Sequence, residues 1–518
     1  MQLTLRRCAT VSAKKQRATV LLFAAVAALT TVAAAQGQQR PVGSGLSAAQ
    51  TAAIDRLGQF SVSGRFAPSV VIAVERKGQT VYARGFGYRN VEAQLPALSS
   101  TPYLIGSNTK QFAAAAILML QDQGKLRVDD RLSKYFPAIP HAREVTLRQL
   151  LTMCSGIADY VEVPQLLKIV RRPARSPAQA VALVKDLPLD FRPGTRWQYS
   201  NSGYMLLQML VERLSGMSFH DFLQRRIFAR LGMHATYLAL SNNLGPTLAG
   251  EYSSFAFGPW ERAPHWDYSW FGAAGALVSD VSDLEKWNAA LDGGKLLSAQ
   301  SLKEMLAPGP AASTPGGEGY GMGIRAGRMP NGHRFIWHGG NTTGSATQDA
   351  RFPDDKLSII VLSNTGYYSY NATVQAIYKI VVPQTPAVNP AKEAPPPPPQ
   401  ADPAKLRAAT RWLDDAIAGR IEMGKLNEDV SAVLTPPHRA ALRALSQYGS
   451  RKYTLVGTDR RRPTTTYFFT VETKKKPFDY QYKWHDDGRI ADILILPILE
   501  FPKEAIATPS PAPVPDQP

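Results

Sequence analysis

Residues 105–124 read IGSNTKQFAAAAILMLQDQG, and this stretch decides the fold. Ala, Ile, Leu and Met fill positions 113–120 without interruption, which predicts a helix buried on nearly all sides. Gly124 ends the pattern. Ser107 and Lys110 are three residues apart at the start of this helix, so both side chains share one face. A helix N-terminus favours negative charge and presents free backbone N–H groups, which suits a nucleophilic serine beside an amine.

A serine and a lysine at this spacing are weak evidence by themselves. Such a pair arises about once or twice by chance in a chain of this length, and Ser12 and Lys15 form another. The alternative interpretation is that Ser107 only caps the helix while Lys110 lies at the surface. As a base, the lysine would need its pKa lowered from about 10.4 to about 7, which requires roughly 4.6 kcal/mol of burial and neighbouring charge.

A second motif lies in the loop sequence WQYSNSG at residues 197–203, ahead of a predicted helix. The phenol of Tyr199 could shuttle protons beside Lys110, and the amide of Asn201 could orient the lysine or a substrate carbonyl. Residues 88–90 have the same Tyr-x-Asn spacing, so this pattern is also weak when taken alone.

A third motif, HGGN at residues 338–341, follows Trp337 at the end of a predicted strand. Its Gly339 and Gly340 would let the backbone approach a bound substrate closely. His338, considered singly, is as readily a structural histidine. The three motifs therefore gain their weight from occurring together.

In this order and spacing, the three motifs resemble the signature of the penicillin-recognising serine hydrolases. That family includes class C β-lactamases, penicillin-binding proteins and their D-aminopeptidase and esterase relatives, and the resemblance covers most of residues 46–382. Further stretches that support it are Gln149–Thr152, Ser155-Gly156, Phe191–Thr195, Phe228–Met233 and Gly272–Ser279.

The resemblance implies a role for each motif residue. Ser107 would attack a carbonyl carbon and form an acyl-enzyme, with Lys110 and Tyr199 moving protons as general base and acid. The backbone N–H groups of Ser107 and Asn341 would hold the oxyanion, and Asn201 would hold the acyl side chain. Which of the lysine and the tyrosine takes the proton from the serine stays open. The expected substrate is a small molecule or peptide with an amide, ester or β-lactam bond, and the residues imply no metal and no cofactor.

His338 departs from the pattern of dedicated β-lactamases, which usually carry Lys at this position to help bind the drug carboxylate. A histidine is mostly neutral near pH 7 and is a poorer carboxylate anchor. We therefore expect a peptidase or esterase rather than an efficient β-lactamase. The alternative is a non-catalytic envelope protein that keeps the fold and binds peptides or glycans.

The distribution of strand-like and helix-like runs predicts the architecture of the large domain. Helical patterns, such as 204–214 and 219–230, occupy its middle. Strand patterns lie at both of its ends, over 69–75, 80–88, 320–325, 334–337, 347–352 and 357–363. Strands at both ends predict an antiparallel sheet flanked by helices, with a helical insert. The family resemblance implies that this is the α/β (α+β) β-lactamase/transpeptidase-like fold with its helical subdomain.

We expect five parts in the chain, and a proline-rich stretch marks the clearest boundary. Residues 383–403 contain five consecutive prolines, which predict an extended linker. It separates the large domain, 46–382, from a small α+β domain over 404–503, with a helix at 406–423 and strands at 467–471, 480–484 and 490–496. On pattern alone the small domain resembles cystatin-like or nuclear-transport-factor-2-like (NTF2-like) domains. We expect a signal peptide over 1–35 and a disordered tail over 504–518.

The first 35 residues predict export. Five basic residues lie within the first seventeen, an apolar run covers 18–35, and small residues precede a cleavage site near Ala35. The expected location is therefore the periplasm or the medium, with no membrane span after cleavage. The alternative is an uncleaved membrane anchor, for which the apolar run is barely long enough.

Composition narrows the function classes further. The chain has 518 residues, 44% hydrophobic and 19% charged, with two cysteines, which excludes disordered, fibrous and disulfide-built classes. The net charge is +18, but basic runs occur only at 460–462 and 474–476 after the leader, without a nucleic-acid motif. We expect these runs to be solvated faces and no nucleic-acid partner, although anionic envelope polymers would attract such a protein.

Overall fold

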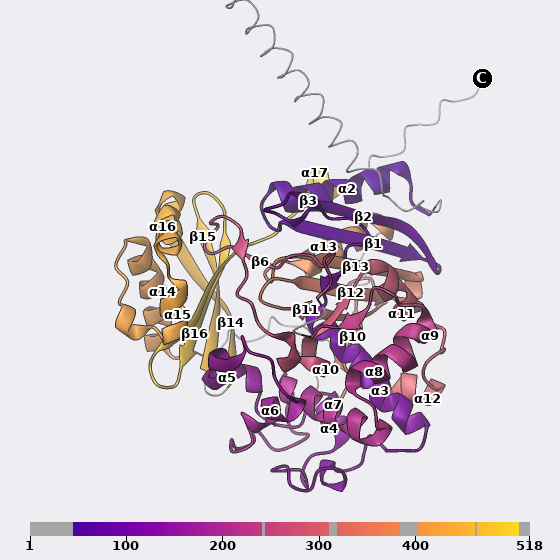
Figure 1. The fold of residues 1–518 in the computed structure, drawn as a ribbon. Helices are drawn as coiled ribbons and strands as arrows, with labels where there is room; N and C mark the ends of the chain where they lie inside the picture. The colour runs from indigo at the N-terminus through magenta and orange to yellow at the C-terminus, as the bar shows by residue number, and fades with distance from the viewer. Residues whose placement is uncertain (1–44, 241–243, 310–318, 384–400, 462–463, 507–518) are drawn as a thin grey trace, which may run out of the picture.

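The computed structural model describes residues 45–506, except for 241–243, 310–318, 384–400 and 462–463. The expected signal peptide, most of the proline-rich linker and the tail from 507 lie outside the described residues. Figure 1 shows a large body built from a sheet and many helices, and beside it a smaller body coloured orange and yellow.

The large body is organised around one eight-stranded sheet with the order β3-β2-β1-β13-β12-β11-β10-β9. Its neighbouring strands pair antiparallel, and β1 pairs with β13, so strands from the two ends of the domain lie side by side. This confirms the expected antiparallel sheet. The strands are β1 (Ser69–Arg76), β2 (Gln79–Asn90), β3 (Leu95–Pro96), β9 (Gly319–Tyr320), β10 (Arg325–Arg328), β11 (Arg334–Asn341), β12 (Ala346–Phe352) and β13 (Leu357–Ser363).

Both faces of the sheet are covered, which explains why β1 is apolar at successive positions. Val70, Ile72 and Val74 belong to the core shared with α2 (Ala48–Ser63) and α13 (Tyr370–Val381). Val71 and Ala73 belong to the core on the opposite, helical side. Because side chains alternate between the faces of a strand, a strand between two cores needs apolar residues on both.

The helical side is centred on α3 (Thr109–Asp122), which is buried from its first residue through Leu120. Phe112 stacks on Trp287 with ring centroids 4.0 Å apart. The helix ends before Gly124, whose φ of +72° suits glycine. The helical side also includes α4 (Leu147–Leu151), α5 (Pro164–Ile169), α6 (Pro177–Ala182), α7 (Asn201–Ser215), α8 (Phe219–Leu223), α9 (Ala229–Leu231), α10 (Gly272–Gly275), α11 (Val281–Asp292) and α12 (Ala299–Leu306). Of these, helices α7, α8, α10 and α12 contact α3.

The smaller body is a helical layer packed on a four-stranded antiparallel meander. Its strands follow one another in the sheet as β14-β15-β16-β17. The elements are α14 (Pro403–Ile417), α15 (Glu428–Val433), α16 (Pro436–Ala444), β14 (Arg451–Arg461), β15 (Thr464–Thr473), β16 (Phe478–His485) and β17 (Ile490–Pro497). The likeness to cystatin-like or NTF2-like domains stays a prediction.

Three local expectations differ from the structure. The strand expected over 320–325 is interrupted, because Gly323 adopts a φ of +69° against the backbone of Lys110, and β10 begins only at Arg325. The helix expected over 406–423 ends at Ile417, just before Gly419 with a φ of +83°. Strand β14 was not expected, because most of its residues are charged or polar, although their exposure alternates along the strand.

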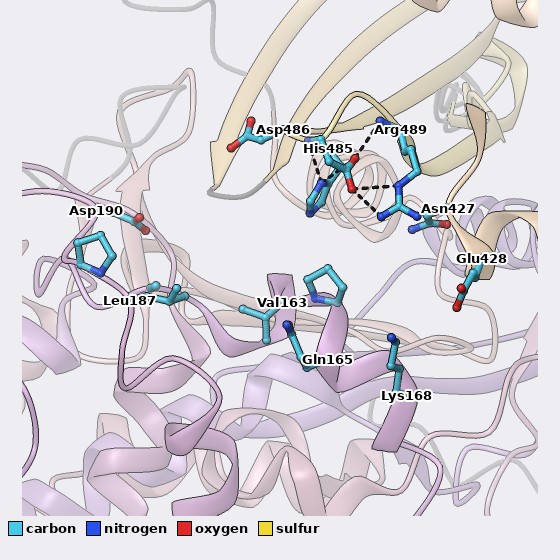
Figure 2. Close-up of a pocket in the computed structure, with 14 residues that line it drawn as sticks. Val163, Gln165, Lys168, Leu187, Asp190, Asn427, Glu428, His485, Asp486 and Arg489 are labelled. Atoms are coloured by element: carbon cyan, nitrogen blue, oxygen red, sulfur yellow. Dashed lines mark hydrogen bonds and ion pairs between the residues drawn. The ribbon is translucent and has the colours of Figure 1, made fainter. Parts of the chain in front are cut away.

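The two bodies meet at an ion pair and at a histidine–carboxylate contact, and they enclose a cavity. Lys483 of β16 lies 2.5 Å from Glu162, and His438 lies 3.0 Å from Glu261. Figure 2 shows the cavity of about 640 Å³, where His485 and Arg489 of the small body face Lys168 and its neighbours across the gap. Within the described ranges, no helix combines the length and hydropathy needed to cross a bilayer.

Phe112 tests how much stability the central helix contributes. Phe112→Ala removes a fully buried ring stacked on Trp287, so we expect it to lower the free energy of unfolding by about 3–5 kcal/mol. The matched control is Leu95→Ala on β3, a 39% exposed apolar side chain whose loss should cost less than about 1 kcal/mol. Urea unfolding followed by tryptophan fluorescence measures both, and equal effects would contradict the packing described.

Candidate active site

Ser107 lies in a single 3-10 turn, Gly106–Asn108, immediately before α3. The turn is tied down on both sides. Thr109 Oγ1 donates to the Gly106 carbonyl at 2.6 Å, and Asn108 Nδ2 donates to Thr347 Oγ1 on β12 at 2.9 Å. Ser107 is half-buried, so a fixed turn holds its hydroxyl at the junction of sheet and helices.

Lys110 is fully buried one turn later, with its amine among three oxygen atoms. Nζ lies 3.0 Å from Ser107 Oγ and 2.8 Å from Asn201 Oδ1, and it donates to the Ala274 carbonyl. Burial lowers the pKa of Lys110 to about 7. A neutral amine has two N–H bonds and one lone pair, so the two carbonyl oxygens occupy the N–H bonds and leave the lone pair for the serine O–H.

Tyr199 completes this group from the loop before α7. Its phenol lies near Ser107, and its ring centroid lies 4.8 Å from Lys110 Nζ. Burial raises the pKa of Tyr199, so the phenol keeps its proton at neutral pH. The structure thus brings together the serine, lysine and tyrosine that the sequence singled out.

Asn201 links the lysine to a buried carboxylate. While its Oδ1 accepts from Lys110, its Nδ2 donates to Asp159 Oδ2 at 2.9 Å. Asp159 is 3% exposed, and burial raises its pKa to about 6. The amide of Asn201 is therefore occupied on both sides, which makes it a holder of the lysine in this structure.

The HGG residues lie inside β11 rather than at the end of a strand. His338 pairs with Asp349 of β12 across the ladder and is 3% exposed. Its Nδ1 donates to the Gly339 carbonyl at 2.6 Å, which leaves Nε2 to accept the Tyr320 hydroxyl at 3.0 Å. Burial, together with the nearby Lys110 and Arg325, lowers the pKa of His338 well below its usual range. The ring is therefore neutral and already hydrogen-bonded at both nitrogens.

Gly340 marks a close approach between β11 and the serine turn. A methyl group built on it would lie 1.8 Å from the Ile105 carbonyl oxygen and 2.9 Å from Ser107 N. One built on Gly106 would lie 2.8 Å from Asn341 N. The backbone N–H groups of Ser107 and Asn341 are therefore brought to the same small region, as an oxyanion site requires.

Two residues beside the site were not singled out from the sequence. Ala274 supplies a carbonyl to Lys110, and Asp159 anchors Asn201. Ala274 lies within the stretch 272–279, and Asp159 follows shortly after the stretch 155–156. Both stretches supported the family resemblance, but neither residue was assigned a role from the sequence. Among the described residues, no group of three or more His, Cys, Asp and Glu side chains is arranged to hold a metal ion.

The sheet, the helical region and the cluster of Ser107, Lys110 and Tyr199 at their junction are features of the β-lactamase-fold class of serine hydrolases. A family model described as Beta-lactamase matches residues 54–380, and the chain belongs to that family.

Individual relatives agree with this assignment. Penicillin-binding protein 4* of Bacillus subtilis (strain 168) is 28% identical over 318 residues, which cover 57% of this chain and 67% of the relative. The solved structure of a D-stereospecific amidohydrolase from Streptomyces sp. is 26% identical with a TM-score of 0.57, covering 63% of this chain and 98% of that one. The chain spans 60–67% of the length of the first curated relatives it matches.

One structural likeness extends beyond the large body. The octameric penicillin-binding protein homologue from Pyrococcus abyssi has a TM-score of 0.54 and covers 85% of this chain and 94% of its own. At 24% identity it shows the fold alone.

The protonation of Lys110 predicts how the reactivity of Ser107 depends on pH. Because its pKa is lowered to about 7, the amine has its lone pair above that pH and loses it below. The rate of Ser107 labelling by a fluorophosphonate should rise with pH through about 7 and then level off. Lys110→Met should slow labelling by roughly 10²–10⁴-fold. Intact-mass spectrometry at pH 5–9 measures the rates, and a flat profile would contradict this role.

Gly340 predicts a steric requirement next to the oxyanion site. Gly340→Ala would place a methyl group against Ile105 O and Ser107 N, so the serine turn must move. We expect labelling of Ser107 to slow by about 10²-fold or more. Gly203→Ala in α7 is the control, since its methyl group would meet nothing closer than 3.5 Å. Equal labelling rates for the two variants would show that the close approach does not matter.

Proposed function

We propose that this protein is an exported hydrolase that cleaves a small amide or ester bond through an acyl-enzyme on Ser107. The observation that carries the proposal is the setting of Lys110. With both N–H bonds directed at the Asn201 and Ala274 oxygens, its lone pair is left facing the Ser107 hydroxyl. A buried amine in that setting is a general base beside a nucleophile.

In the acylation step, Ser107 Oγ bonds to the substrate carbonyl carbon and passes its proton to Lys110 Nζ. The carbonyl oxygen becomes an oxyanion held by the backbone N–H groups of Ser107 and Asn341. When the oxyanion collapses, the bond to the leaving amine or alcohol breaks. Tyr199 relays a proton to that group: its hydroxyl gives one proton to the leaving group and takes one from Lys110, so the phenol ends protonated, as its raised pKa requires.

In the second step, a water molecule attacks the ester carbon and gives its proton to Lys110. The Ser107 ester bond then breaks, the acid product leaves, and the lysine returns the proton to Ser107 Oγ. Lys110 is favoured over Tyr199 as the base because burial lowers the pKa of the amine and raises that of the phenol. These opposite shifts support the lysine in the choice of base that the sequence left open.

The third motif favours an amide or ester over a β-lactam. His338 is neutral, buried and bonded at both nitrogens, so it offers no cation to a drug carboxylate. Asn341 lies three residues further along β11, and its Nδ2 donates to the Gly366 carbonyl at 2.7 Å. The named activity of the Streptomyces relative, amide hydrolysis, supports the same substrate class.

We propose that hydrolysis takes place outside the cytoplasm. The support is the basic, then apolar composition of residues 1–35 with small residues before the expected cleavage site at Ala35.

The experiment is an intact-mass screen of the purified protein against a fluorophosphonate, p-nitrophenyl esters, D-amino-acid amides and β-lactams. We expect an adduct on Ser107, absent in Ser107→Ala, together with ester or amide turnover. Nitrocefin turnover should stay far below about 10⁶ M⁻¹s⁻¹, and a value near that figure would contradict the substrate class. A complete lack of adducts and turnover would support the non-catalytic binding protein instead.

A further inference from the structure

Arg461, at the end of β14 in the small body, reaches the active site of the large one. Its guanidinium carbon lies 5.9 Å from the centre of the Tyr199 ring. Nη1 lies 3.7 Å from Glu162 Oε1 and 4.0 Å from Asp159 Oδ2. Its Nε donates to Asp459 Oδ2 at 2.7 Å, so its own strand fixes its direction. The side chain is 27% exposed, which contradicts the expected solvated face at this position.

Four short steps connect this arginine to the nucleophile. Arg461 faces Asp159, whose Oδ2 accepts from Asn201 Nδ2 at 2.9 Å. Asn201 Oδ1 accepts from Lys110 Nζ at 2.8 Å, and that nitrogen lies 3.0 Å from Ser107 Oγ. A carboxylate as buried as Asp159 stays ionised only with cations nearby. The basic groups that face it are Arg461 and Lys110, and of these two the arginine keeps its charge in the active form, in which the lysine is neutral.

We propose that Arg461 is a positioning residue of the active site, through which the C-terminal domain keeps Asp159 ionised and thereby holds the Asn201–Lys110 pair against Ser107. The inference rests on the proposed function, because it concerns the base of that same reaction. It goes further by assigning the small domain a part in catalysis and not only in docking.

The charged groups around this series of contacts, from Arg461 to Ser107, come from several elements. Asp159 is faced by Glu162 of its own segment, by Arg461 and by Lys110. Arg461 is faced in addition by Asp459 of β14.

The remaining neighbours lie on the side of the phenol. Tyr199 is faced by Arg325 of β10, by Arg461 and by Asp159. The nearby His338 is neutral. Arg461 is thus the cation from the small body that faces both Asp159 and Tyr199.

Removing Arg461 should shift the pH dependence of Ser107 reactivity in a predictable direction. Without Arg461, the pKa of Asp159 rises, and the first proton taken up by the coupled Asp159–Lys110 pair is bound at higher pH. The active form needs an ionised aspartate and a neutral lysine. The acid limb of Ser107 reactivity must therefore move to higher pH, while the plateau above it changes little.

The test measures the rate of fluorophosphonate labelling of Ser107 against pH in the full chain. In Arg461→Met we expect the acid limb to move up by about 0.5 to 1 pH unit, which is a roughly three- to tenfold slower reaction near pH 6. Arg461→Lys should restore the profile, because it keeps the charge. Arg460→Met is the matched control: it removes a neighbouring charge whose guanidinium pairs with Asp486 instead.

Two further variants separate positioning from docking. Lys483→Met removes the ion pair with Glu162 but leaves Arg461 in place. If the shift in Arg461→Met came only from loosened docking of the small body, Lys483→Met should show the same shift. Asp159→Asn removes the proposed intermediary, so adding Arg461→Met to it should move the acid limb by less than about 0.2 unit. Circular dichroism checks that each variant is folded, and if Arg461→Met does not fold, the conservative Arg461→Lys and the Asp159→Asn background carry the comparison.

The outcomes are distinguishable. A wild-type protein that reacts at Ser107 while Arg461→Met keeps an unchanged profile overturns this inference and leaves the proposed function standing. The same shift in Lys483→Met, or an undiminished shift in the Asp159→Asn background, overturns it as well. A wild-type protein that fails to react overturns the proposed function itself, and this inference with it.

Discussion

The structure depends on the burial of one lysine amine among oxygen atoms of three different segments. Lys110 alone would be an ordinary charged side chain, and its ammonium form could not lie at zero exposure without strong compensation. The oxygen atoms of Asn201 and Ala274 provide that compensation for the neutral form. The third direction is left for Ser107, so the same contacts that permit burial also direct the lone pair.

This arrangement requires the large body to be rigid at the junction of sheet and helices. The serine turn is clamped between α3 and β12 through Thr109 and Asn108, and β11 approaches it so closely that Gly340 has no room for a side chain. The eight-stranded sheet and the apolar helix α3 therefore fix the position of the serine turn together. The shape of the site follows from packing that involves few of the reacting groups.

The sequence predicted those parts of the site that are carried by local pattern. The apolar run of α3, the spacing of Ser107 and Lys110, and the order of the three motifs are all visible along the chain. The contacts of Ala274 and Asp159 were not predictable in this way, because each depends on where a distant segment lies in space. Gly323 shows a related limit: its positive φ is set by packing on Lys110, which no strand pattern reveals.

The basic run near the C-terminus shows the same limit for charge. Arg460 and Arg461 are neighbours in sequence, yet one pairs with Asp486 near the surface and the other faces Asp159. Alternation along β14 sends them to opposite sides, and β14 itself was not expected from its polar composition. The expectation of a solvated face was therefore reasonable for the run and wrong for Arg461.

The charges between the nucleophile and the small domain alternate in sign, and this alternation has a physical cause. Lys110 is buried near Asp159, Asp159 near Arg461, Arg461 near Glu162, and Glu162 near Lys483. Each buried ion needs an opposite charge to offset its lost hydration, so the sequence of ions continues until solvent is reached. In this protein it reaches solvent only on the far side of the domain boundary. A large domain that ended its charge pairing at Asp159 would leave that carboxylate dependent on Lys110 alone, and a lysine in such a pair would stay protonated and could not accept the proton of Ser107.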